Sequence, residues 1–319
     1  MRAVIPVALA GLRSDQALAR VFPEYSRTTL KSWMLAGRVH VDGRSVEPRH
    51  VVSGGEAVEL APPPPCAILE RPAAIPIEVI HEDSEIWVVN KAAGLVVHPG
   101  AGNREGTLLN ALLHLDPGLA ALPRAGIVHR LDKDTSGLLV IARSPRAHKS
   151  LVAQLKARRI TREYQGIVSG AMVAGGSVEA AIGRHPTHRT HMAVVERGGK
   201  PAVTHYRVMR RFRLHTHVRL LLETGRTHQL RVHLAHVHYP LVGDAVYGGR
   251  PRLPPKALPA LAQALREFPR QALHAVRLAL EHPVGGAALS FVAPLPADMA
   301  ALIGLLFEDA ERAGPVNAR

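Results

Sequence analysis

Four consecutive prolines, Pro62–Pro65, constrain the folding of this chain more than any other feature. They donate no backbone N–H groups and prefer polyproline geometry, so they can neither continue a helix nor pair inside a sheet. Such a run in the interior of a chain is typical of a semi-rigid linker. The sequence therefore predicts two domains, residues 12–60 and residues 76–319, joined by a linker over residues 61–75.

The composition indicates a globular protein without a membrane anchor. The 319 residues are 47% hydrophobic and 21% charged, which excludes a disordered chain. Cys66 is the single cysteine, so an internal disulfide and a zinc site built from several cysteines are both excluded. No apolar run approaches the length of about 18 residues that a spanning helix needs, and Pro6 breaks the apolar start of the chain. We therefore expect a cytoplasmic protein with no membrane partner.

The charge of the chain is strongly positive and unevenly distributed. Lys and Arg total 40 against 26 Asp and Glu, a net charge of +14. Residues 143–231 contain 18 basic and 4 acidic side chains, so this one segment carries a net +14. A field of this sign attracts polyanions, of which nucleic acid is the commonest. A basic protein whose arginines are merely solvated is the alternative that composition leaves open.

The first domain combines short helices, a hairpin and basic side chains. Ser14 or Asp15 can cap a helix that ends at Val21, and a second helix ends near Gly37. A strand then leads into an Asp-Gly turn, and a later strand covers residues 57–60. Two helices followed by a hairpin resemble the small RNA-binding module first known from a small-subunit ribosomal protein. The resemblance implies that the RNA-contacting residues of this module are Arg27, Lys31 and Arg38.

The second domain is expected to be α+β, with a large mixed or largely antiparallel sheet. Its predicted strands are residues 77–80, 86–89, 137–142, 164–168, 203–209, 218–222 and 289–292. Its predicted helices are residues 107–115, 145–157, 227–236 and 259–267. Strands and helices do not alternate strictly, which argues against a doubly wound parallel sheet.

A charged loop at residues 126–135 precedes the apolar strand at residues 137–142. It carries two carboxylates, Asp132 and Asp134. A carboxylate held beside cations on a loop that a buried strand anchors is a plausible nucleophile. The residues alone leave a structural alternative open, in which Asp132 pairs with an arginine and Asp134 caps a turn.

Several motifs of the second domain occur in the order typical of one enzyme family. His129-Arg130-Leu131-Asp132, followed by Thr135-Ser136-Gly137, resembles the signature of the RluA-type pseudouridine synthases. Further matching segments are residues 162–164, 224–234, 240–244 and 271–275. Residues 95–103 and 184–187 are similar to the D-type branch of the family, which acts on large-subunit ribosomal RNA. The resemblance spans about residues 12–305, and Ala92 departs from it because the family usually has proline there.

This resemblance implies an isomerase that turns uridine into pseudouridine in RNA. The reaction breaks an N–C glycosidic bond and rejoins the base through carbon, so nothing is oxidised, and the family implies neither a cofactor nor a metal. Asp132 is the nucleophile by resemblance, and its attack on the ribose or on the uracil ring stays open. The D-type branch implies 23S ribosomal RNA as partner, in the helix 69 stem-loop, either free or in an assembling large subunit, bound by a monomer.

The resemblance also assigns four residues to substrate binding. Arg226 corresponds to the arginine that pairs with the catalytic aspartate and keeps it ionised. Tyr164 corresponds to the tyrosine that stacks on the target base, and Leu230 to an apolar residue lining the uracil pocket. Arg130 would fill the gap left by the flipped nucleotide, whose extrusion costs a few kcal/mol.

Two other functions were weighed against this one. A non-catalytic RNA-binding or ribosome-assembly factor would not need Asp132, Tyr164 and Arg226 together. A metal-dependent nuclease would need a carboxylate cluster, which the sequence lacks. Four histidines lie close in sequence without a cysteine or a carboxylate among them, and we expect RNA contacts rather than metal ligation from His228, His233, His236 and His238.

Overall fold

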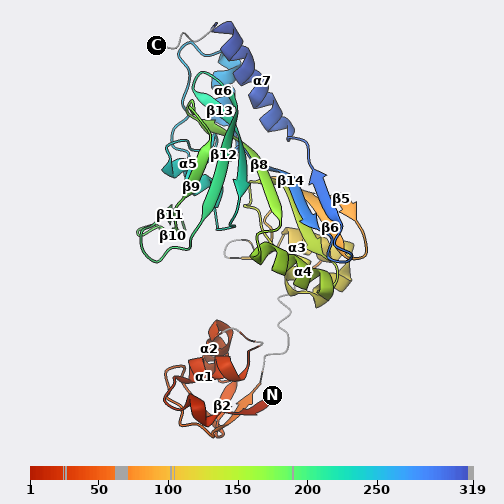
Figure 1. The fold of residues 1–319 in the computed structure, drawn as a ribbon, viewed down its shortest axis with the longest axis vertical. Helices are drawn as coiled ribbons and strands as arrows, with labels where there is room; N and C mark the ends of the chain where they lie inside the picture. Colours follow the sequence, from red (N-terminus) through yellow and green to blue (C-terminus); the bar gives the residue numbers. More distant parts are fainter. Residues whose placement is uncertain are drawn as a thin grey trace. The chain divides into compact units, whose positions relative to one another are not determined.

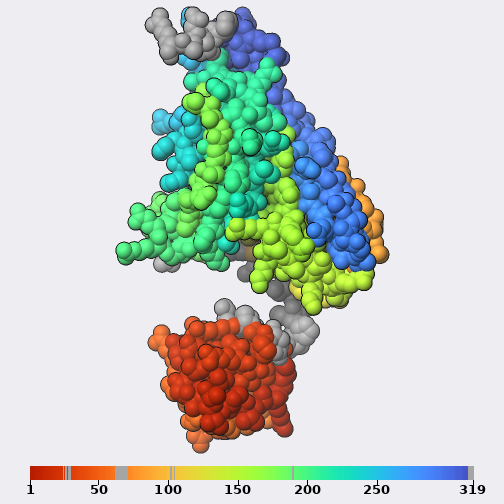
Figure 2. Space-filling view, in the orientation of Figure 1, coloured from red at the N-terminus to blue at the C-terminus, as the bar shows by residue number. Residues whose placement is uncertain are grey.

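The structure is a computed structural model that describes residues 1–23, 25, 27–61, 71–100, 103, 105–188 and 190–314. It contains two compact units, Met1–Leu69 and Glu70–Arg319, and the residues of the first form one closed red-to-orange body in Figure 2. Most of the predicted linker, including its four prolines, falls on residues 62–70, outside the described residues. Each unit has a hydrophobic core of its own.

The first unit is a four-stranded sheet with two helices. Its elements are β1 (Arg2–Val4), a 3-10 turn (Val7–Leu9), α1 (Ser14–Val21), α2 (Arg27–Leu35), β2 (Val39–Val41), β3 (Arg44–Ser45) and β4 (Ala57–Leu60). The strands follow the order β1-β4-β2-β3 and all pair antiparallel. Asp42 and Gly43 both have positive φ, as the predicted Asp-Gly turn requires. β1 lies before residue 12, so the first eleven residues contribute a strand to this unit.

The start of α1 differs from the prediction. Arg13 occupies the N-cap position, and neither Ser14 nor Asp15 caps the helix. The Ser14 hydroxyl instead donates to the carbonyl of Glu47 at 2.7 Å. The buried carboxylate of Asp15 accepts hydrogen bonds from Arg13 at 3.2 Å and from Arg27 at 2.8 Å. These side chains therefore tie α1 to its neighbours, and Arg27 joins the two helices.

The second unit is built on one large sheet (Figure 1). Its strands are β5 (Glu78–Glu82), β6 (Ile86–Lys91), β7 (Ser136–Ala142), β8 (Thr161–Ser169), β9 (Gly176–Glu179), β10 (Ile182–Arg184), β11 (Met192–Val194), β12 (Val203–Arg211), β13 (His215–Leu222), β14 (Leu273–Glu281) and β15 (Ala288–Val292). Its helices are α3 (Leu108–Leu115), α4 (Pro145–Lys156), α5 (Gln229–His236), α6 (Pro259–Glu267) and α7 (Ala297–Arg312), with short 3-10 turns at Pro117–Ala121 and Pro123–Gly126.

The sheet is mixed and largely antiparallel, which confirms the predicted fold class. Its strand order is β5-β6-β7-β14-β8-β13-β12-β9, with β15 paired to β14, while β10 and β11 form a separate hairpin. Within the described residues, β7 and β14 form its one parallel pair. The sequence analysis predicted neither β14, at the centre of the sheet, nor the C-terminal helix α7.

β7 follows the loop that carries Asp132, and it is buried on both faces. Leu139 and Ile141 pack into the same core as α3, whereas Leu138 and Val140 pack into the core shared with α4. This alternation follows from the two-residue period of a strand. Gly137, at φ +117°, lets β7 approach β14, because a Cβ there would lie 2.3 Å from a carbonyl oxygen of that strand.

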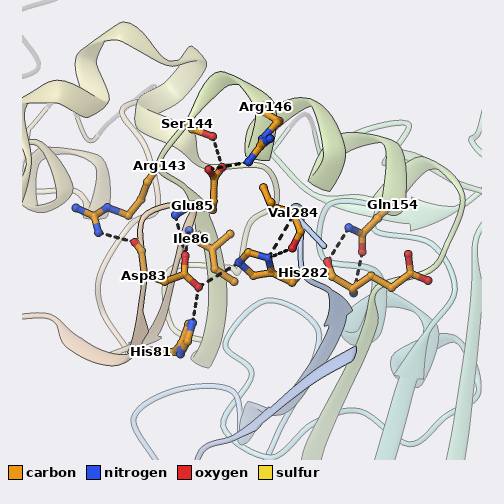
Figure 3. A network of polar contacts seen from close by, with 11 residues as sticks. His81, Asp83, Glu85, Ile86, Arg143, Ser144, Arg146, Gln154, His282 and Val284 are labelled. Atoms are coloured by element: carbon orange, nitrogen blue, oxygen red, sulfur yellow. Dashed lines mark hydrogen bonds and ion pairs between the residues drawn. The ribbon is translucent and has the colours of Figure 1, made fainter. Parts of the chain in front are cut away.

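A polar network joins turns at one end of the sheet (Figure 3). The Oδ1 atom of Asp83, which follows β5, accepts hydrogen bonds from the backbone N–H groups of Glu85 and Ile86. Its Oδ2 atom lies 2.8 Å from Nε2 of His81 and 3.2 Å from Nε2 of His282. Because His282 follows β14, this one carboxylate connects segments 199 residues apart in the chain.

Candidate active site

A cavity of about 320 Å³ opens in the second unit, between the loop before β7, the start of β8 and the start of α5. All five residues that the sequence analysis assigned to catalysis and substrate binding line it: Arg130, Asp132, Tyr164, Arg226 and Leu230. They come from three separate segments of the chain, which the sheet brings together. Asp134, the second carboxylate of the loop, does not line the cavity.

Asp132 belongs to a chain of charges that leads away from the cavity into the protein. Its Oδ2 atom accepts a hydrogen bond from Nη1 of Arg231 at 3.3 Å. The other side of the same guanidinium forms a bidentate pair with Asp244, at 2.7 and 2.9 Å. The Asp244 side chain is fully buried, and it also accepts from the backbone N–H groups of Val246 and Tyr247. Asp244 thus holds Nε and Nη2 of Arg231, and Nη1 contacts Asp132.

The electrostatics of this chain keep its central members charged. Burial would lower the pKa of Arg231, but its hydrogen bonds to Asp244 and the nearby carboxylates of Asp244 and Asp132 raise it. Burial would raise the pKa of Asp244, but hydrogen bonding and attraction from Arg231 hold it below its usual value. A permanent cation, the Arg231 guanidinium, therefore lies beside the Asp132 carboxylate.

The arginine that contacts Asp132 is not the one that the resemblance indicated. Nε of Arg226 donates to the carbonyl of Pro201 at 3.1 Å, and this side chain makes no ion pair within the described residues. The backbone N–H of Arg226 is held by the Gln229 side chain, which places the residue in the loop before α5. Arg231 lies on α5 itself, with its guanidinium over the ring of Tyr247. The predicted pairing of Arg226 with Asp132 is therefore wrong, although Arg226 does line the cavity.

Tyr164 lies on β8 at the inner end of the cavity and is 5% exposed. Burial raises its pKa to about 12, with a further contribution from the Asp132 carboxylate and an opposing one from Arg162. The phenol is therefore protonated throughout the physiological range. Arg162 precedes Tyr164 by two residues on the same face of β8 and also lines the cavity, and its Nε atom is buried without a hydrogen-bond partner among the described residues.

A buried lysine, Lys91, contacts the loop that carries Asp132. Nζ of Lys91 donates to the carbonyls of Ala92, Leu95 and Lys133 at 2.7 to 2.8 Å. Burial lowers the pKa of this lysine to about 7, against the attraction of the loop carboxylates. Arg270 adds a contact to the carbonyl of Asp134 at 3.2 Å. The Asp134 carboxylate makes no hydrogen bond within the part of the chain described, so of the structural alternative only the pairing of Asp132 with an arginine is found, and Asp134 does not cap the turn.

Two of the four histidines near α5 contact other groups of the protein. Nδ1 of His228 lies 2.8 Å from the Tyr247 hydroxyl, and the ring of His233 lies 3.0 Å from both the Thr204 hydroxyl and the Ala180 carbonyl. In the described part of the chain, no group of three or more potential ligands has the arrangement of a metal site.

Sequence reasoning assigned no role to Arg231, Asp244 and Arg162, although all three lie in the segments that carry the resemblance. One signal could have identified the pair of Arg231 and Asp244. An arginine that is buried on a helix needs an acidic partner nearby. The three predicted RNA-contacting residues of the first unit differ in exposure and in pairing. Lys31 is exposed, Arg38 is half-buried, and Arg27 pairs with Asp15.

A family profile and two similar proteins show which family the chain belongs to. The profile of a family described as RNA pseudouridylate synthase matches residues 85–236. Ribosomal large subunit pseudouridine synthase D of Pseudomonas aeruginosa is 53% identical over 309 residues, covering 97% of this chain and 96% of the relative. The protein of the same name from Escherichia coli K12 is 54% identical, covering 94% and 92%. The chain belongs to the RNA pseudouridylate synthase family.

Solved structures agree with the family assignment. The chain resembles human RNA Pseudouridylate Synthase Domain Containing 1, with a TM-score of 0.56 and 27% identity, over 73% of this chain and 89% of that one. Human RNA Pseudouridylate Synthase Domain Containing 4 gives a TM-score of 0.56 at 26% identity, over 72% and 93%. The protein is an RNA pseudouridine synthase and hence an isomerase. No helix within the described residues is long and apolar enough to cross a membrane.

Proposed function

We propose that this enzyme converts uridines of 23S ribosomal RNA to pseudouridine, with Asp132 as its nucleophile. The observation that carries the proposal is the position of Asp132, a carboxylate at the cavity wall held 3.3 Å from the buried guanidinium of Arg231. Its side chain is 16% exposed, so it is accessible from the cavity and yet constrained. The hydrogen bond from Arg231 orients this carboxylate, and an oriented carboxylate at a cavity wall can act as a nucleophile.

The chemistry needs one such carboxylate. The bond from C1′ of the ribose to N1 of uracil breaks, and a bond from C1′ to C5 forms after the base turns over. N1 gains a proton and C5 loses one, so the atoms balance and nothing is oxidised. Asp132 can hold the fragments together by adding to the ribose or to the ring, and both routes use the same carboxylate.

The cavity lining supports binding of a single flipped base. Tyr164 and Leu230 provide apolar surface for the uracil ring, and the phenol stays a hydrogen-bond donor because its pKa is about 12. Arg130 is exposed where the cavity opens, so it is free to occupy the space that the flipped nucleotide leaves in the RNA.

The names of the relatives support the large-subunit RNA as substrate, and the basic segment at residues 143–231 supports a folded RNA. We propose the helix 69 stem-loop as the target, bound by a cytoplasmic monomer either as free RNA or within an assembling large subunit. The unpaired loop would supply the base that stacks on Tyr164. The first unit, with Lys31 and Arg38 available on its surface, would add RNA affinity.

The decisive experiment replaces the proposed nucleophile. Asp132→Asn should reduce pseudouridine formation to below a few per cent of the wild-type rate, because the amide is not a nucleophile, while RNA affinity stays near wild type. Asp134→Asn is the matched control, since its carboxylate lies two residues away and outside the cavity. Turnover that survives Asp132→Asn, or an equal loss in Asp134→Asn, would contradict the assignment.

A second experiment tests the substrate. Transcripts of the helix 69 stem-loop, of other large-subunit hairpins and of tRNA anticodon arms are incubated with the enzyme, and pseudouridine is mapped in each. We expect preferential modification of the helix 69 loop. Preference for an anticodon arm would reject the proposed substrate and leave the role of Asp132 intact.

A further inference from the structure

A second cavity, of about 230 Å³, lies on the other side of Asp244 from the active site. Its lining combines the loop after α5, the end of α6 and the start of β13. Ser169, at the far end of β8, also lines it, five residues beyond Tyr164. At about 3.3 Å per strand residue, the two cavities are about 16 Å apart along β8.

His215 is the unusual residue of this second cavity. It is 0% exposed, and neither Nδ1 nor Nε2 has a hydrogen-bond partner among the described residues. Burial lowers its pKa to about 4, and the nearby Arg252 lowers it further against the attraction of Asp309. A buried imidazole with two unpaired nitrogens is costly, and such a group generally has a partner in the functioning protein.

The charged side chains around His215 indicate which kind of ligand this cavity binds. Three arginines, Arg250, Arg252 and Arg266, line the cavity, and within the described residues none of them has an acidic partner. The carboxylates nearby are already neutralised: Asp244 is paired with Arg231, and Asp309 with Arg213 at 3.0 Å. The cavity therefore presents unpaired guanidinium groups and one imidazole N–H donor, the set of groups that binds a phosphate.

We propose that this second cavity holds a phosphate group of the substrate RNA backbone, with Arg252 and His215 as its main contacts. The contact is independent of the base that enters the active site. It anchors the RNA about 16 Å from Tyr164, and it adds affinity without reading sequence. Because every RNA offers such phosphates, the site serves the target and other RNAs alike.

The test has one arm for the anion and one for the RNA. In the first arm, the thermal unfolding midpoint of the full-length protein is followed with increasing inorganic phosphate. Binding to the folded state raises the midpoint, and we expect a smaller rise for Arg252→Gln and for His215→Leu than for wild type. Arg277→Gln is the matched control, because it removes the same charge from β14, outside this cavity, and should show the wild-type rise.

His215→Leu also guards against a folding artefact. Since the ring nitrogens have no partners among the described residues, an apolar side chain of similar size should leave stability in phosphate-free buffer at or above the wild-type level. Lower stability would show that the imidazole has an internal role, and Arg252→Gln would then carry the test alone. An unchanged phosphate response in Arg252→Gln would overturn the proposal.

The second arm measures RNA affinity against salt for a target and a non-target hairpin, without scoring uridine conversion. Arg252→Gln should weaken both about equally and reduce the slope of log K against log salt by about 0.7–0.9 relative to Arg277→Gln. A phosphate response that is lost while the RNA slope matches the control would show a site for free phosphate and reject the RNA contact. If the wild type binds but does not modify the hairpin, the proposed substrate fails and this arm still stands.

Discussion

The guanidinium of Arg231 lies between two carboxylates, one at the wall of the active cavity and the other fully buried. Its removal would leave Asp244 charged and unpaired in the interior, which typically costs about 3–5 kcal/mol. Among the described residues Arg226 has no acidic partner, and its side chain donates to the carbonyl oxygen of Pro201. The two arginines of one short motif therefore differ in what they do for the fold.

This difference gives a prediction at the residue scale. Arg231→Ala should lower the free energy of unfolding by about 3–5 kcal/mol and abolish activity. Arg226→Ala should change stability by less than about 1 kcal/mol and act mainly on KM for RNA. Urea unfolding and steady-state kinetics of the two variants provide the comparison. Equal destabilisation by the two substitutions would contradict the ion-pair chain described here.

At the scale of elements, the loop that carries Asp132 is fixed by its contacts with other segments. Lys91, at the end of β6, donates three hydrogen bonds from one ammonium group and so joins residues 92–95 to the turn after Asp132. All three carbonyls would lose this donor if the lysine were replaced, and the Lys133 carbonyl would keep the backbone N–H of Gly94 as another donor. Both the Lys91 contacts and the connection to β7 therefore position the loop.

We therefore expect Lys91→Met to destabilise the protein by about 2–4 kcal/mol, because buried carbonyls are left unpaired. It should also lower kcat more than RNA affinity, since the turn that follows Asp132 loses its anchor. Lys133→Met is the control, because the Lys133 side chain is exposed and only its carbonyl is used. Circular dichroism in urea and single-turnover kinetics measure the two effects. Wild-type stability in Lys91→Met would show that the three contacts contribute nothing.

The Asp83 network at the end of the sheet predicts a pH dependence. Burial alone would raise the pKa of Asp83, but hydrogen bonds from His81 and the backbone, with the charge of His282, lower it to about 2. A folded-state pKa below the unfolded value of 3.8 stabilises the fold above that pH, and the contribution is lost as the pH falls from about 4 to about 2.

The stability difference between wild type and Asp83→Asn should accordingly be largest above pH 4 and shrink towards pH 2. Urea unfolding at several pH values measures it. Glu311→Gln, which removes an exposed carboxyl from α7, should show little difference at any pH. A difference for Asp83→Asn that stays constant from pH 7 to pH 2 would contradict the lowered pKa.

At the scale of the whole molecule, the two units have separate cores, and every residue that lines the active cavity belongs to the second. Deleting residues 1–69 should therefore weaken RNA binding and reduce its salt dependence, while kcat at saturating RNA is largely kept. Lys31→Gln, at an exposed position of α2, should show a smaller effect in the same direction without loss of fold. Full RNA affinity and selectivity in the truncated protein would require another role for the first unit.

The division into two units and the mixed sheet could be predicted from local signals, whereas the residues of the active-site cavity were predicted from the family resemblance. A proline run, alternating strands and a loop with two carboxylates can be recognised in the sequence, because each depends on residues that are close together in it. Tyr164, Arg130 and Leu230 were placed in one site because their motifs occur together in a known family. All three line one cavity, and their roles stay predictions.

Contacts between distant segments could not be read in the same way. Arg226 and Arg231 lie five residues apart, and the direction of each depends on where α5 begins, which the Gln229 contacts to Val203 and Thr204 determine. β14 is mostly buried and so lacks a clear alternation of apolar and polar residues, and its pairing with β7 on one side and β8 on the other identifies it as a central strand. The choice of Arg231 as partner of Asp132 thus came from tertiary packing, because it rests on a buried carboxylate 13 residues further along the chain.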